Sequence, residues 1–105
     1  MTKDLQIIEK LESKFREFYY EFKDNKVTRL EVINLNLENK DLKIIGELAS
    51  LKHLRLQGNK ITKIEGLDNL ANLETLNVII LRYNNIPREE IKQFKTNNPK
   101  IKVYD

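Results

Sequence analysis

The chain has 105 residues, of which 33% are charged and 40% are hydrophobic. This balance is typical of a folded globular domain with a modest core and argues against a disordered chain. No apolar run reaches the roughly 18 residues of a membrane span, the first residues contain no secretory signal, and there is no cysteine for disulfides or thiolate metal sites. We therefore expect one domain over residues 1–105 and a cytoplasmic location.

The net charge of +3 arises from 19 basic and 16 acidic residues that are spread along the chain. A nucleic-acid-binding domain more often has a basic stripe with interleaved aromatic residues. We therefore expect a mixed, solvated surface, and neither nucleic acid nor a membrane is an expected partner.

The first segment predicts a helix with one apolar stripe, because hydrophobic residues recur at three- and four-residue steps. Thr2 is suited to cap this helix, and Asp4 is suited to its first turn, where a negative charge complements the helix dipole. The stripe consists of Leu5, Ile8, Leu11 and Phe15.

A β-hairpin is expected next. Aromatic residues over about Glu17–Phe22 favour a strand, and Asp24 and Asn25 are typical of a tight turn before a second strand that starts at Val27. The alternative is one helix that continues to about Lys23. In either case residues 1–26 are expected to cover the apolar end of the segment that begins at Val27. A binding role for the Phe18-Tyr19-Tyr20 cluster is the less favoured interpretation.

The clearest pattern lies at residues 51–61, which read L-x-x-L-x-L-x-x-N-x-I. Asn59 is expected to hydrogen-bond unpaired backbone groups where the chain bends away from a short strand. The residues between the apolar positions should face outward. The inward positions are Leu51, Leu54, Leu56 and Ile61.

Residues 27–37 fit the same frame, with Leu35 in the place of the asparagine. After each such stretch, apolar residues recur at three-residue steps, which predicts a return through short 3₁₀ or loose helical turns. These residues are Leu42, Ile45, Leu48 and Leu51 in the first copy, and Ile61, Ile64, Leu67, Leu70 and Leu73 in the second.

The third copy allows two frames. The frame from Leu73 gives a 22-residue second copy but puts Leu81 where the asparagine belongs. The frame from Leu76 places Asn84 correctly, and we favour it. The chain then carries about three extra residues, and Val78 and Ile80 lie on the exposed strand face rather than in the core.

Residues 87–105 are expected to close the structure with a helix and a strand. Pro87 suits the first position of a helix, and a strand over about 100–105 could pair with the last copy and shield its edge. The charged residues expected at the two ends of the helix are Glu89, Glu90, Lys92 and Lys95.

Residues 27–86 resemble leucine-rich repeat proteins, and the 22-residue form of 51–72 is most similar to the class found in phosphatase-regulatory and small bacterial or archaeal members. Residues 83–91 and 98–101 are similar to the C-terminal cap of those short members. The resemblance implies an α/β solenoid of about three repeats with parallel strands on its concave face. It also implies that proteins bind to this face.

The sequence does not predict an enzyme. His53 is the only histidine and falls at an outward strand position, with no second histidine to share a metal. The adjacent Glu89 and Glu90 are accounted for by the first turn of a helix, and the three glycines form no phosphate-binding loop. We expect no catalytic residue, cofactor or metal.

The function that we predict from the sequence is therefore that of a non-catalytic scaffold that binds a protein partner on the strand face, where apolar residues beside arginine are typical of interfaces. One alternative is a self-assembling, homo-oligomeric structural protein. Another is a subunit of an RNA–protein particle, because the chain also resembles the leucine-rich subunit of a spliceosomal particle. The candidate binding residues are Arg29, Glu31, Ile33, His53, Arg55, Gln57, Val78, Ile80 and Arg82.

Overall fold

The computed structural model describes residues 2–71 and 73–105, and within these ranges it forms a five-stranded sheet in the order β1-β2-β3-β4-β5. The first strand is antiparallel to the second, and the other neighbours are parallel. The strands are β1 (Tyr19–Lys23), β2 (Lys26–Glu31), β3 (His53–Arg55), β4 (Val78–Ile80) and β5 (Lys102–Tyr104).

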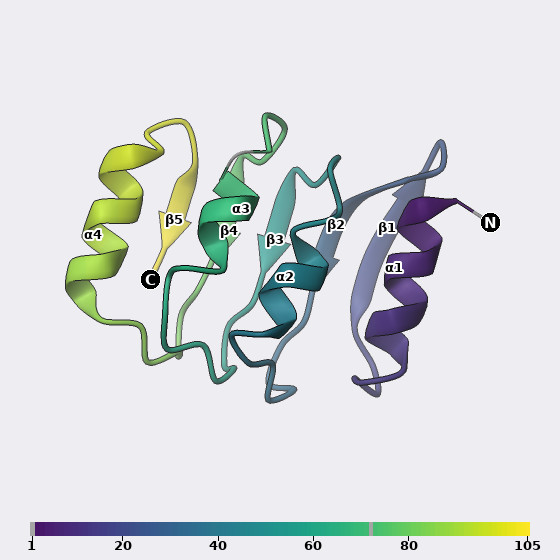
Figure 1. Cartoon of the computed structure of the whole chain (residues 1–105), viewed down its shortest axis with the longest axis horizontal. Coiled ribbons are helices and arrows are strands. Elements are labelled where there is room, and N and C mark those ends of the chain that lie inside the picture. The colour runs from purple at the N-terminus through teal and green to yellow at the C-terminus, as the bar shows by residue number, and fades with distance from the viewer. Residues whose placement is uncertain (1, 72) are drawn as a thin grey trace.

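The described helices lie on one side of this sheet (Figure 1). They are α1 (Lys3–Glu12), α2 (Asp41–Ile45), α3 (Leu67–Ala71) and α4 (Arg88–Asn97). No described helix covers the opposite side of the sheet, which we call the open face.

The hairpin formed by β1 and β2 confirms the expected helix, strand and turn, and the alternative of one helix to Lys23 is wrong. The strand begins two residues later than expected, at Tyr19. Asp24 and Asn25 form the two-residue turn with φ angles of 52° and 65°, the left-handed conformation that tight hairpins require.

The N-terminal helix is capped as predicted, because the Thr2 hydroxyl accepts a hydrogen bond from the Leu5 N–H at 3.3 Å. Asp4 has a further role that its first-turn position did not indicate. It is only 9% exposed, and its carboxylate accepts the Val27 N–H at 2.8 Å. This bond joins α1 to the start of β2 and supplies a partner for a buried backbone donor.

The parallel strands are evenly spaced along the chain. Successive strands are 24, 25 and 24 residues apart, because the residues that lie side by side in the register are Arg29, His53, Val78 and Lys102. Buried Ile79 lies beside Leu54. The frame from Leu76 is thus confirmed. The length of 22 residues that the frame from Leu73 gives for the second copy is wrong.

The extra residues of the second copy belong to its return segment and do not interrupt the strand. This segment contains α3, and because a helix rises only about 1.5 Å per residue it accommodates more residues over the same span. Both α2 and α3 are single α-helical turns rather than 3₁₀ turns. Their leucine-rich faces are directed toward the sheet and are buried.

The core is one cluster between the helices and the sheet, and it contains every inward position predicted for residues 51–61. Leu35, Ile64, Leu73 and Ile86 are only partly buried against it. The predicted N-terminal stripe contributes Ile8, Leu11 and Phe15, while Leu5 is partly exposed and Ile7 is buried in its place.

The C-terminal helix and strand form as expected, with β5 paired in parallel to β4. Two details differ. Pro87 is the residue before the helix rather than its first residue, and Lys95 alone is the basic residue of the last turn, because Lys92 lies earlier. In addition, the Glu90 carboxylate accepts the Ile64 N–H at 3.0 Å, which ties α4 to the preceding return segment.

Candidate functional site

The side chains that alternate with the core residues along the strands gather on the open face. The parallel register aligns them in rows, and backbone bonds from Asn34 to Gln57 and from Gly58 to Arg82 continue this alignment past the strand ends. The three rows are Arg29, His53 and Val78; Glu31, Arg55 and Ile80; and Ile33, Gln57 and Arg82. All nine residues proposed from the sequence therefore lie together.

The edge strands extend these rows with residues outside the nine, among them Tyr19 of the aromatic cluster for which binding was the less favoured interpretation. Glu21 pairs with Arg29 and Tyr19 with Glu31 on β1, while Lys102 and Tyr104 pair with Val78 and Ile80 on β5. Tyr19 is 51% and Tyr104 is 41% exposed. The alternation within the expected edge strands was the signal that could have identified them.

The β2 side of the face has an internally bonded group of charges. Arg29 Nε lies 2.9 Å from a Glu31 carboxylate oxygen, and its Nη2 lies 3.3 Å from His53 Nε2. Because a guanidinium only donates, Nε2 must accept, which requires a neutral imidazole with its proton on Nδ1. Burial, and then the positive charge of Arg29, lower the pKa of His53 and favour this form.

The other charged residues of the face are held by different neighbours. The Tyr19 hydroxyl donates to Glu21 at 2.6 Å, and this bond to a carboxylate is the main cause of the raised pKa of Tyr19. Arg55 Nε donates to Gln57 Oε1 at 2.9 Å. Arg82 stands over the ring of Tyr104 at 5.7 Å from its centre, a cation–π geometry.

The aromatic cluster of the first segment divides between the core and this face. Phe18 and Tyr20 pack partly buried against the core, with ring centres 6.0 Å apart. Tyr19 points to the open face, as its pairing with Glu31 requires.

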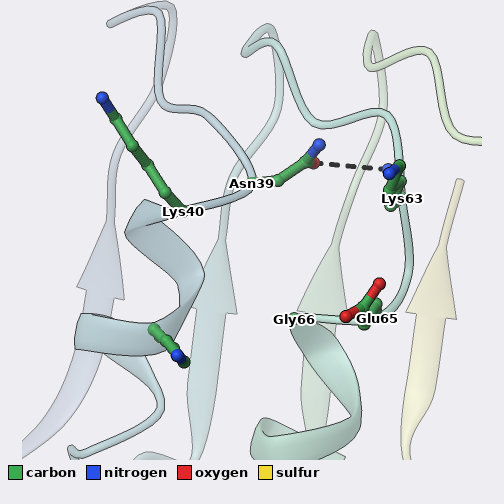
Figure 2. A pocket seen from close by; sticks show the side chains of 6 residues that line it. Asn39, Lys40, Lys63, Glu65 and Gly66 are labelled. Atoms are coloured by element: carbon green, nitrogen blue, oxygen red, sulfur yellow. Dashed lines mark hydrogen bonds between the residues drawn. The ribbon is translucent and has the colours of Figure 1, made fainter.

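An open hollow of about 380 Å³ lies between the return segments on the helix side (Figure 2). Asn39 bridges it, because its side-chain oxygen accepts the N–H groups of Thr62 at 2.9 Å and Lys63 at 3.3 Å. These bonds join one return segment to the next, which accounts for the asparagine structurally. The hollow is lined by Asn39, Lys40, Lys43, Lys63, Glu65 and Gly66.

The part of the chain that the structure describes contains no group of three or more His, Cys, Asp or Glu residues placed to hold a metal ion. Within those same residues, no helix is both long and apolar enough to cross a membrane. Polar, aromatic and apolar groups converge on the open face.

Comparison with protein families matches residues 49–96 to the family described as leucine-rich repeats, in two copies. This stretch contains both Asn59 and Asn84 with their turns. Residues 49–96 are thus leucine-rich repeats. Leucine-rich repeat domains generally mediate protein–protein interactions and are generally not catalytic. Comparison with curated proteins gives no match.

Proposed function

We propose that residues 1–105 form one short leucine-rich repeat solenoid, with about three repeats over 27–86 and caps over 1–26 and 87–105. The even spacing of the parallel strands supports the repeats. Burial of apolar side chains from both terminal helices supports the caps, because the ends of a repeat array must be covered. These side chains are Ile7, Ile8 and Leu11 of α1, and Ile91 and Phe94 of α4.

We further propose that this protein is a non-catalytic module that binds a protein partner through the open face. The observation that carries the proposal is the convergence on this face of arginines with partly buried Val78 and Ile80. Arginine, tyrosine and apolar residues are the groups from which the energetic centres of interfaces are built.

The test compares two variants that change the net charge equally. Arg55→Glu with Ile80→Glu alters the open face, whereas Lys43→Glu with Gln93→Glu alters exposed positions on the helix side. Each protein is immobilised and the captured proteins are quantified by mass spectrometry, with circular dichroism as the check of folding. We expect the open-face variant to lose its specific partner by about tenfold or more and the helix-side variant to keep it.

Equal capture by the two variants would reject the open face as the binding surface. Sedimentation velocity of the unmodified protein separates this function from self-assembly. A concentration-dependent dimer that the open-face variant abolishes would assign the face to a second copy of the chain instead of a partner.

A further inference from the structure

The open face has two halves with different charge. On the β1–β2 half, the carboxylates of Glu21 and Glu31 are engaged by Tyr19 and Arg29. On the β3–β5 half, the described residues 53–57, 78–82 and 102–104, which form the strands and their direct continuations, include three cationic side chains and no carboxylate. The cationic residues are Arg55, Arg82 and Lys102.

The two guanidinium groups of this half are held in place but not neutralised. Arg55 uses only Nε, in its bond to Gln57, and Arg82 is positioned over Tyr104. Among residues 2–71 and 73–105, neither arginine forms an ion pair. Each therefore presents N–H donors that can bind a carboxylate through two parallel hydrogen bonds.

Neighbouring carboxylates do not cancel this positive charge. Glu31 lies beside Arg55 in the register but bonds to Arg29 at 2.9 Å. Asp105 follows Tyr104 directly, yet it pairs with Lys95 of α4 at 2.8 Å, away from the strand row. The excess of positive charge is a property of the β3–β5 half of the face.

An apolar strip runs through the same half. Val78 and Ile80 are one pleat apart on β4, and both are only partly buried. In the register, Ile80 lies between Arg55 and Tyr104, and Val78 lies between His53 and Lys102. An apolar side chain of a partner could pack on Val78 and Ile80 and lose its contact with water, while the charged neighbours stay at the edge. Protein interfaces are built in this way, with an apolar centre and a polar rim.

We propose that the β3–β5 half of the open face binds an acidic segment of a partner protein, with its carboxylates on Arg55 and Arg82 and an apolar side chain on Val78 and Ile80. This inference rests on the proposed function and specifies the chemistry of the partner. A nucleic acid fits less well, because the centre of this half is formed by Val78 and Ile80, and branched aliphatic side chains offer no stacking surface for bases.

The test uses a short fluorescent peptide rich in Asp and Glu with one central Leu, and amide chemical shifts of the labelled protein. Binding should shift the amides of β3, β4 and β5 more than those of β1. Arg55→Gln with Arg82→Gln should weaken the affinity about tenfold or more. Lys43→Gln with Lys63→Gln removes equal charge beside the hollow of Figure 2 and should leave the affinity unchanged.

Two further probes test the two parts of the surface. Replacing the acidic residues of the peptide by their amides should abolish binding, and replacing the central Leu by Ser should weaken it. The inference is overturned if the lysine variant loses as much affinity as the arginine variant. It is also overturned if a single-stranded RNA of equal charge binds more tightly than the peptide.

Failure of this inference is distinguishable from failure of the proposed function. If the acidic peptide does not shift the open face but the natural partner is still lost from the open-face variant, the face binds proteins of other chemistry. If the partner is also retained, both proposals fail.

Discussion

The turns around Asn59 and Asn84 have the same kind of hydrogen bonding, but the two asparagines are buried to different degrees. Asn59, which is 7% exposed, accepts the N–H groups of Leu35 and Leu37 at 3.1 and 3.0 Å. It also donates to the carbonyls of Val32 and Leu56. Asparagine in this turn thus joins its own repeat to the preceding one.

Asn84 makes the corresponding bonds in the next turn. Its oxygen accepts one N–H, that of Ile61 at 3.0 Å, and its amide donates to the carbonyls of Leu56 and Leu81. It is only partly buried, so water can replace part of this bonding. The first copy has Leu35 at this position, and its neighbour β1 is antiparallel, so no equivalent turn lies beside it to be joined.

The residue before the asparagine position shows a second contrast. Asn34, Gly58 and Tyr83 all have left-handed backbones, with φ of 55°, 72° and 60°. Glycine adopts this conformation freely, whereas a tyrosine is strained there by roughly 1–2 kcal/mol. The turn therefore requires a left-handed backbone at this position, and different residue types can adopt it.

The largest effect is expected from Asn59→Ala. The N–H groups of Leu35 and Leu37 and the carbonyl of Val32 would lose this partner, whereas the Leu56 carbonyl keeps its bond from Asn84. A buried backbone group costs about 1–3 kcal/mol when it is unsatisfied. With partial relaxation we expect a loss of about 4 kcal/mol, measured by urea unfolding. Asn85→Ala, at an exposed neighbouring position, should change the unfolding free energy by less than about 0.5 kcal/mol. A loss below about 1 kcal/mol for Asn59→Ala would show that this asparagine does not join the repeats.

Asn84→Ala should cost about 2 kcal/mol, because fewer and more accessible groups lose their partner. The same urea titration measures it. The double variant with Asn59→Ala should cost more than the sum of the two single variants. Both amides donate to the Leu56 carbonyl, so each single variant leaves this carbonyl one donor and the double variant leaves it none. Equal single-variant costs, or strict additivity, would contradict the difference between the turns.

Gly58→Ala is expected to destabilise by about 1.5 kcal/mol. The left-handed backbone disfavours a Cβ atom, and the added atom would lie 1.7 Å from the side-chain oxygen of Asn34. Repeating the substitution in an Asn34→Gly background removes this contact and should leave only the backbone part. Thermal unfolding compares the two, and an equal cost in both backgrounds would show that Asn34 moves aside freely.

Tyr83→Gly should have the smallest effect and the opposite sign. Tyr83 is 81% exposed, so little packing is lost while the backbone strain is relieved, and a gain of up to about 1 kcal/mol is expected. Tyr19→Gly, at an exposed but extended position of β1, should instead destabilise by about 1 kcal/mol. A loss of stability in Tyr83→Gly would mean that the ring makes a contact that its exposure does not suggest.

Much of the fold and of the candidate site could be predicted because the information is local. Alternation along short strands assigned Leu54 to the core and Arg55 to the open face. Asn84 alone separated the two frames that are possible for the stretch after Leu73. The hairpin turn at Asp24 and Asn25 follows from residues that favour left-handed backbones. The nine proposed binding residues follow from this same two-residue period.

The tertiary structure decided what depends on residues about 24 positions or more apart. The position of the extra residues was one such property. Asn84 indicates their number along the chain, but only the structure places them in the return segment that contains α3. The roles of Asp4 and Glu90 were others, since each bonds a backbone group 23 or 26 residues away. The two-residue alternation of apolar and polar residues by itself determined which side chains of each strand face the core. Lateral packing determined which strands meet, and therefore placed Tyr104 beside Ile80 and left the β3–β5 half of the open face positively charged.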